Sequence, residues 1–590
     1  MSFTTVLDGI LRDCFAACGY APGGGLAKYS DRPDLCQFQC NEAFKIAKEQ
    51  KKNPRDVAGQ IVRQLEGYDI FAAISIAGPG FINLTLRDDF LAKHVEEMAT
   101  APNMGIPQRA RRKIIIDFGG ANVAKPLHVG HLRSAIIGEG LKRLARELGH
   151  EVIGDVHLGD WGRQMGIIIS EIRRRKPELV YFDETFTGAY PAESPVTIEE
   201  LDEIYPTASA AAKEDEERMQ EAREATATLQ NQERPGHRGY YALWKHMVAV
   251  SIRDLKENYD KLGVCFDLWR GESDCFKSIP AMTDFLRAKN LLRESDGAII
   301  MDVAEPDEAA PLPPVIIKTK SDSVGYQTTE LATLWERVHE FAPDEVWYVV
   351  DGRQSLHFKQ IFRAAYQSGI ASEDLTLAFI DFGTMNGKDG KPFKTRDGGV
   401  MKLGDLLALV QQSAKGKYDD DEAYHLSEAE KEALSFPIAD ATIKYADALS
   451  HRSTDYIFDI EKFTATQGKT GPYILYSAVR MHSLLKKAEE KGLPPGPLMP
   501  PTRDDERNLL LTLARLPDVV EAAYRYKSLT DIADYLFELN SAYNVFYTEN
   551  RILSEEDEAK RASWLGLTAI AERMNKKLLG IMAISIPERM

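Results

Sequence analysis

Long apolar runs are absent from this 590-residue chain. No stretch approaches the roughly 18–20 consecutive apolar residues that a membrane-spanning helix needs, so we expect no membrane span. The first fifteen residues carry acidic side chains and no basic segment ahead of an apolar run, which argues against a signal peptide. The expected location is therefore the cytoplasm.

Cysteine is scarce, with six residues in the whole chain. Four of them form two C-x₃-C pairs, a spacing that also occurs in zinc sites. The first pair lies on a helical pattern, where cysteines four residues apart act as small apolar side chains on one face. We therefore expect packing, no metal site and, in the cytoplasm, no disulfide. The pairs are Cys14 with Cys18 and Cys36 with Cys40.

A positive net charge is also lacking, because 73 basic against 90 acidic residues leave a formal charge of −17. This balance excludes a protein that coats nucleic acid without regard to sequence, although a local basic face would suffice for a structured RNA. Residues 109–113 and 173–176 are candidates for such a face, and solvated surface charge is the alternative for each. The length predicts three or four domains.

Residues 113–149 organise the chain. Residues 113–118 form a β-branched run typical of a buried parallel strand, and residues 119–130 form a glycine-bearing loop. From His131 apolar residues recur at helical spacing up to Leu148, and Gly149 is a stop signal. Strand, loop and helix start in this order are typical of phosphate binding, because free backbone N–H groups and the helix dipole point at the anion.

The loop ends in His128-Val129-Gly130-His131. Two imidazoles three residues apart can donate hydrogen bonds to phosphate oxygens where charge develops in a transition state. Gly130 has no side chain, so a base or ribose can lie against the backbone there. The alternatives are a pair of helix-capping histidines or a zinc site, and zinc would need further ligands that the neighbouring sequence does not supply.

The thirteen residues 122–134, NVAKPLHVGHLRS, resemble the signature loop of class I aminoacyl-tRNA synthetases, and of arginyl-tRNA synthetases in particular. The resemblance implies a multidomain α/β plus all-α fold. It places an N-terminal additional α/β domain at 1–108, a Rossmann-like doubly wound catalytic domain at 109–426 with a helical insertion at about 177–265, and a helical anticodon-binding domain at 427–590.

The implied reaction is activation of L-arginine by ATP, followed by transfer of the arginyl group to the terminal adenosine of the arginine tRNA. Mg²⁺ is expected to travel with ATP, since it is usually held by substrate phosphates and few protein ligands. The family implies a monomer that activates arginine only when tRNA is bound. A synthetase for another amino acid, a non-catalytic tRNA-binding protein and a small-molecule adenylyltransferase are the alternatives.

The arginine site implied by the resemblance consists of carboxylates, amides and a phenol. A planar guanidinium with five N–H donors fits such a lining in fork geometry, and a neutral side chain would leave buried carboxylates unpaired. Glu330 stands where the family usually has Asp, and its side chain is one methylene longer. The residues are Asn122, Glu272, Tyr326, Glu330 and Gln354.

Residues 385–403 form a loop rich in glycine and lysine that can close over a triphosphate. The loop occupies the place of the K-M-S-K motif of class I synthetases but reads P-F-K-T-R. In arginyl enzymes a lysine ahead of the HxGH loop is thought to supply the missing charge, and Lys125 stands there. The catalytic candidates are Lys125, His128, His131 and Lys394; the ATP-binding candidates are His128, Gly130, His131, Lys388, Lys391 and Lys394.

Five residues are candidates for tRNA contacts by resemblance to the outer domains of the family. An aromatic ring can stack on an unpaired base, and an amide can read the edge of a base. A core position is an equally good interpretation of Phe81. The candidates are Phe81 and Asn83 in the N-terminal domain, and Asn544, Tyr547 and Arg551, expected to be exposed, in the C-terminal domain.

Periodicity and turn signals predict the remaining elements. Residues 177–205 look irregular, 208–231 read as one exposed charged helix, and 266–273 and 318–330 look strand-like and rich in turns. Helices are predicted at 5–18, 40–49, 54–65, 88–99, 164–175, 241–262, 356–368, 428–434, 438–450, 471–487, 504–514, 517–526, 529–547 and 559–582. Strands are predicted at 71–77, 81–86, 151–158, 345–350 and 375–382.

Overall fold

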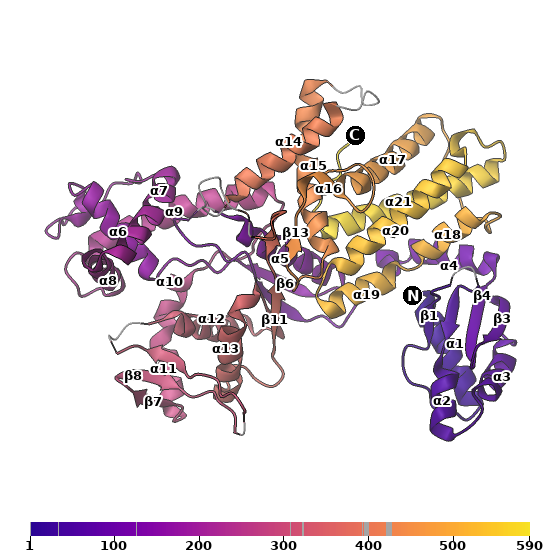
Figure 1. Cartoon of the computed structure of the whole chain (residues 1–590), viewed down its shortest axis with the longest axis horizontal. Coiled ribbons are helices and arrows are strands. Elements are labelled where there is room, and N and C mark those ends of the chain that lie inside the picture. The colour runs from indigo at the N-terminus through magenta and orange to yellow at the C-terminus, as the bar shows by residue number, and fades with distance from the viewer. Residues whose placement is uncertain are drawn as a thin grey trace. The chain divides into compact units, whose positions relative to one another are not determined.

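The computed structural model describes residues 2–590 except 33–34, 126, 307, 321–323, 392, 394–400 and 420–426. The chain divides into two compact units, and Figure 1 shows the elements of both. The first unit comprises Met1–Arg109, Ala465–Ile581 and Ser585–Met590. The second comprises Ala110–Thr464 and Met582–Ile584.

The second unit contains a four-stranded parallel sheet in the order β11-β10-β5-β6. The chain enters at the central strand β5 and adds β6 on one side, and only later adds β10 and β11 on the other side. The order therefore reverses between β5 and β10, and ligands bind at the carboxyl ends of strands at such a point. The predicted doubly wound sheet is confirmed. Its strands are β5 (Lys113–Asp117), β6 (Glu151–Asp155), β10 (Glu345–Asp351) and β11 (Thr376–Phe382).

Helix α5 (Val129–Glu147) connects β5 to β6 and packs closely on the sheet. A Cβ atom at Gly138 would lie 2.2 Å from the Phe118 ring, so only glycine permits this approach. The helix begins at Val129, two residues earlier than expected, because His128 caps it.

The insertion consists of α7 (Ile198–Glu214), α8 (Glu216–Gln230) and α9 (His237–Lys261), which form one cluster with the preceding helix α6 (Arg163–Arg175) (Figure 1). The irregular structure expected up to residue 205 is wrong from Ile198 onward, because Thr197 and Glu200 form a capping box that starts α7. The single exposed helix expected at 208–231 is also wrong. Asp215 caps a new helix there, and α8 buries the small apolar face of Ala222 and Ala225.

The segment after the insertion holds elements that periodicity did not predict. Residues 326–330 were expected to be rich in turns, but they form the first turn of helix α12, which begins at Tyr326. The new elements are α10 (Glu272–Cys275), α11 (Ile279–Ala288), an antiparallel sheet of β7 (Leu292–Ser295), β8 (Ala298–Met301) and β9 (Val315–Lys318), and α12 (Tyr326–Phe341). The predicted helix α13 (Ser355–Ser368) is confirmed.

Helical structure resumes earlier than residue 427, with α14 (Leu403–Asp419). The two helices expected at 428–434 and 438–450 are one helix, α15 (Glu428–Leu449), with Pro437 inside it. A short parallel pair, β12 (Met385–Asn386) with β13 (Tyr456–Ile457), precedes α16 (Ile460–Phe463).

In the first unit, the N-terminal segment forms an antiparallel sheet in the order β1-β2-β4-β3. Strands β3 (Phe71–Ala77) and β4 (Phe81–Leu86) were predicted, whereas β1 (Ala27–Tyr29) and β2 (Phe38–Cys40) are too short for a periodic signal. The predicted helices are confirmed as α1 (Phe3–Ala17), α2 (Glu42–Gln50), α3 (Pro54–Leu65) and α4 (Asp88–Thr100). Cys14, Cys36 and Cys40 are buried free thiols in this domain.

The C-terminal helices of the first unit contact this domain through ion pairs and hydrogen bonds. Arg507 forms a bidentate pair with Asp88, at 2.7 Å for both bonds, and Lys577 donates to Asn103 at 2.7 Å. No described helix is both long and apolar enough to cross a membrane. The helices are α17 (Gly471–Glu490), α18 (Asp504–Leu513), α19 (Leu516–Tyr526), α20 (Thr530–Glu549) and α21 (Glu558–Ile581), close to the predicted bounds.

Candidate active site

The loop after β5 leaves the carboxyl end of the strand and runs to His128. Four hydrogen bonds from side chains and backbone elsewhere in the unit fix the conformation of this loop. Ala124 takes a positive φ of 58°, which the surrounding bonds maintain. The bonds are Gly119 N to Ser134 Oγ at 2.8 Å, Val123 N to Gly159 O at 3.0 Å, Ala124 N to Ser251 Oγ at 2.9 Å, and Gln164 Nε2 to Val123 O at 2.6 Å.

The paired imidazoles cap the first turn of α5. His128 Nδ1 accepts from Gly130 N at 3.0 Å, and His131 Nδ1 accepts from His128 N at 3.2 Å. The rings stack with centroids 3.8 Å apart. Because each Nδ1 is an acceptor, the neutral rings carry their proton on Nε2. Both histidines therefore act as caps and still offer an N–H donor each.

Burial keeps both rings neutral near pH 7. Burial, followed by the charges of His128 and Lys125, lowers the pKa of His131 to about 3. Burial and then Lys125 and Arg353 lower the pKa of His128. Only glycine at position 130 leaves space for the His128 ring, since a Cβ atom there would lie 2.8 Å from His128 Cε1. The site thus holds two neutral donors rather than two cations.

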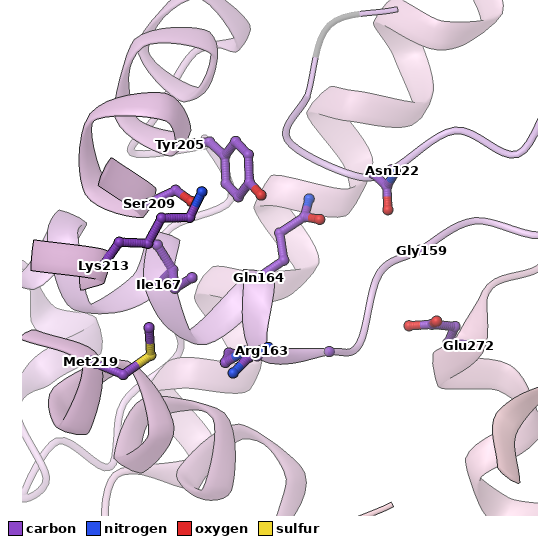
Figure 2. A pocket seen from close by; sticks show the side chains of 11 residues that line it. Asn122, Gly159, Arg163, Gln164, Ile167, Tyr205, Ser209, Lys213, Met219 and Glu272 are labelled. Carbon is purple, nitrogen blue, oxygen red and sulfur yellow. The ribbon is translucent and has the colours of Figure 1, made fainter. Parts of the chain in front are cut away.

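Two of the predicted arginine ligands line one pocket of about 530 Å³. Figure 2 shows Asn122 and Glu272 on one side of this pocket, and Tyr205, Ser209 and Lys213 of α7 on the other. Gly159 allows Asn122 to approach, because a Cβ atom there would lie 2.3 Å from Asn122 Oδ1. Glu272 begins α10, and its backbone N–H donates to Leu158 O at 3.0 Å.

The other three predicted ligands meet at the start of α12. Tyr326 and Glu330 lie four residues apart, hence on one face of the helix, and the Tyr326 hydroxyl lies 3.5 Å from Gln354 Oε1. The Tyr326 ring stacks on His357 with centroids 4.5 Å apart. Glu330 is 3% exposed, and its Oε2 has no hydrogen-bond partner among the described residues. A buried acceptor without a partner suits a cationic ligand.

The two glutamates interact electrostatically, so the halves of the site are close. Burial raises the pKa of Glu272 to about 7, with further increases from Asp160 and Glu330. Burial also raises the pKa of Glu330, although His157 and a hydrogen bond from Tyr326 oppose this. A guanidinium beside these carboxyls would favour their ionised forms and oppose the effect of burial.

Sequence reasoning missed the charged layer beneath these residues. Arg337 of α12 donates to Asp117 at 2.6 Å and to Asp155 at 2.7 Å, joining the ends of β5 and β6. His157, which follows β6, is buried, and neither ring nitrogen has a partner among the described residues. Burial lowers the pKa of His157, but Glu330 and Asp117 outweigh this and raise it. The available signal was position, because Asp117, Asp155 and His157 lie near the carboxyl ends of the strands predicted at 113–118 and 151–158.

The predicted phosphate-binding lysines are spread out. Lys125 places its ammonium 4.2 Å from the centroid of the Tyr205 ring. Lys388 is engaged by Asp459 at 3.2 Å and Glu461 at 3.0 Å, so its charge is neutralised in this conformation. Lys391 is exposed in the turn that follows β12. Lys394 lies outside the described residues.

The predicted tRNA contacts all lie in the first unit. Phe81 is half-buried, and Asn83 is buried and accepts from Gln39 at 2.9 Å. Asn544 is half-buried, contrary to the exposure expected, because α17 packs beside it and Arg480, Tyr473 and Ser477 bond its amide. Tyr547 and Arg551 are exposed. These five assignments stay predictions.

Comparison with known proteins decides the family. The catalytic-domain model of class I (R) tRNA synthetases matches residues 94–460, which is more than half of the chain. The chain belongs to the arginyl-tRNA synthetases. The DALR anticodon-binding domain matches residues 474–590, and the arginyl-tRNA synthetase N-terminal domain matches residues 22–86.

Relatives of this arginyl-tRNA synthetase family match over nearly their full length. An arginine–tRNA ligase of Alkaliphilus oremlandii is 49% identical over 586 residues, which cover 99% of each chain. One of Agathobacter rectalis is 45% identical over 98% of each chain. The fold is similar to the Plasmodium falciparum arginyl-tRNA synthetase structure, with a TM-score of 0.80 at 23% identity, covering 100% of this chain and 99% of that one.

Proposed function

We propose that this chain ligates L-arginine to its tRNA, and that the described site performs both steps. In the first step the arginine carboxylate attacks the α-phosphorus of ATP. An O–P bond to the amino acid forms while the bond to pyrophosphate breaks. In the second step the terminal adenosine of the tRNA takes the arginyl group, and AMP leaves.

The observation that carries this proposal is a pair of desolvated glutamates, Glu272 and Glu330, in the same unit as a pair of neutral N–H donors. Glu330 is buried and Glu272 is half-buried, desolvation raises the pKa of both carboxyls, and Asn122 adds an amide. A guanidinium can satisfy both carboxylates in fork geometry, whereas lysine supplies only a point charge. The site therefore favours arginine over the other amino acids.

Acceleration of the first step is attributed to position and electrostatics. The Nε2–H groups of His128 and His131 donate to phosphate oxygens as negative charge shifts to the leaving pyrophosphate. Lys125 adds a cation beside them, because the lysine loop departs from the usual motif. We propose that Lys391 and Lys394 close over the triphosphate, with Lys388 after it leaves Asp459 and Glu461. Mg²⁺ is expected to arrive with ATP.

The tRNA is proposed to bind through the first unit, where Phe81, Asn83, Asn544, Tyr547 and Arg551 lie. Arginine activation is proposed to require bound tRNA, as the family resemblance implies. A monomer in the cytoplasm is the expected state. These assignments follow from family resemblance together with the exposure of Tyr547 and Arg551.

Pyrophosphate exchange with each of the twenty amino acids, with and without total tRNA, tests the proposal. We expect exchange with arginine alone and only when tRNA is present. Preference for another amino acid would overturn the proposed substrate. Binding of tRNA with no exchange for any amino acid would instead indicate a non-catalytic tRNA-binding protein.

A further inference from the structure

Helix α7 of the insertion contacts two lysines that belong to the catalytic loops. Its Asp202 Oδ2 accepts from Lys402 Nζ at 2.8 Å. Its Tyr205 ring lies 4.2 Å from Lys125 Nζ, measured to the ring centroid. The two acceptors are three residues apart, so they lie on one face of the helix. A single element of the insertion therefore reaches both lysines.

Both lysines are tied to the paired imidazoles. Lys125 lies three residues before His128, and its charge lowers the pKa of both rings. Lys402 pairs with the His128 backbone in an antiparallel bridge, and Val129 N donates to Met401 O at 3.2 Å. The end of the lysine loop is thus fastened to the loop that holds the histidines.

The same face of α7 lines the pocket that contains Asn122 and Glu272. Tyr205, Ser209 and Lys213 form the wall opposite these two residues (Figure 2). The adjacent face of α7 carries the packing, because Leu201, Ile204 and Ala208 are buried. Asp202 and Tyr205 are only half-buried. The residues that contact the lysines are therefore separate from those that hold the helix in place.

We propose that Tyr205 and Asp202 are positioning residues for arginine activation, Tyr205 holding the Lys125 ammonium beside the imidazoles and Asp202 holding the end of the lysine loop. The inference rests on the proposed function, since it assigns how that reaction keeps its cations in place. A lysine has a flexible four-carbon stem, and the face of an aromatic ring attracts its charge without neutralising it. The ring thus restricts the ammonium while leaving its charge available to phosphate.

The test measures arginine-dependent pyrophosphate exchange at saturating tRNA. We expect Tyr205→Leu to lower kcat about tenfold, the effect of losing one partly buried cation–π contact, with the KM for arginine unchanged. Tyr205→Phe keeps the ring face and should stay within about twofold of wild type. Asp202→Asn should lower kcat about threefold, since it keeps the shape but loses the ion pair.

A double-mutant cycle separates positioning from packing. In a Lys125→Met background, Tyr205→Leu should cause no further loss of kcat, because the group on which the ring acts is gone. Equal losses in both backgrounds, or a loss in Tyr205→Phe as large as in Tyr205→Leu, would overturn the inference. A rise in tRNA-free activation in Tyr205→Leu would also overturn it, because the ring would then restrain Lys125.

Failure of the inference and failure of the proposed function give different results. If the wild-type chain shows no arginine-dependent exchange, the proposed function fails, and the inference fails with it. If the wild-type chain is active and Tyr205→Leu matches its kcat, only the inference fails. Thermal unfolding of each variant, expected to match wild type, shows that kcat reports on intact protein.

Discussion

Single side chains in this site owe their protonation states to burial. His128 and His131 stay neutral because desolvation and neighbouring cations disfavour their protonated forms. Burial likewise disfavours the charged form of Glu272, and this raises the pKa of its carboxyl to about 7. The charge of Glu272 therefore changes near neutral pH, where a cationic ligand would favour its ionised form.

Arginine affinity should therefore depend on pH around 7. The guanidinium pairs with ionised Glu272, so below a pKa of about 7 binding must first remove a proton. We expect the KM for arginine to fall as pH rises, by about tenfold per unit below that pKa and little above it. Exchange assays between about pH 6 and pH 8 measure this, and Glu272→Gln should weaken binding and flatten the profile. A flat wild-type profile would contradict the assignment.

Replacing His131 by Ala should remove arginine activation and leave tRNA affinity nearly intact. The variant loses an N–H donor to phosphate, for which we expect a decrease in kcat of about 10²–10³-fold. His131→Asn is the matched control for the cap, because its side-chain oxygen can still accept from His128 N. Exchange rates and tRNA binding by filter retention are the measurements. An active His131→Ala variant would rule out the proposed role.

The helices and strands differ in how far the sequence predicts them, and the cause is physical. Strand β5 and helix α5 could be predicted because each carries a continuous apolar pattern next to a glycine-bearing loop. Helix α8 was misplaced because its buried residues are mainly alanines, which give little periodic contrast. The start of α12 was missed because it has no side-chain cap, and Gly325 precedes Tyr326 directly.

The residues of the candidate site also differ in how far the sequence predicts them. The imidazole pair and the glutamates were found through motifs, since each lies in a distinctive local sequence. The Arg337 contact to Asp117 and Asp155 joins residues 220 and 182 positions apart, so no local pattern reports it. The residues that engage Lys388, Asp459 and Glu461, are also remote from it in sequence.

Arg337 should be important for the stability of the sheet that carries the site. Arg337→Met would leave Asp117 and Asp155 buried without their cation, a change that costs about 3–5 kcal/mol of unfolding free energy. Arg353→Met removes an ion pair whose arginine side chain is 82% exposed, and should cost no more than about 1 kcal/mol. Urea unfolding measures both. Equal costs would show that the buried contacts carry no special share of the stability.

The two units separate the proposed chemistry from the proposed tRNA contacts. Residues Ala110–Thr464 hold the imidazoles and the two glutamates, whereas the N-terminal domain and the helices from α17 onward belong to the other unit. Helix α15 falls within the catalytic unit. The domain boundaries expected at 108 and 426 stay predictions.

This separation predicts that a change in the first unit affects tRNA without affecting arginine. Tyr547 is exposed on α20, and Arg480 lies 5.0 Å from its ring centroid, so a base stacked on the ring would also meet a cation. Tyr547→Ala should raise the KM for tRNA in charging assays about tenfold, the loss of one stacked base, while the KM for arginine stays unchanged. Tyr526→Ala is the matched control, because Tyr526 is 60% exposed on α19 of the same unit and lies outside the predicted contacts. If both variants raise the KM for tRNA equally, the effect belongs to the general surface of the unit and the assignment of Tyr547 fails.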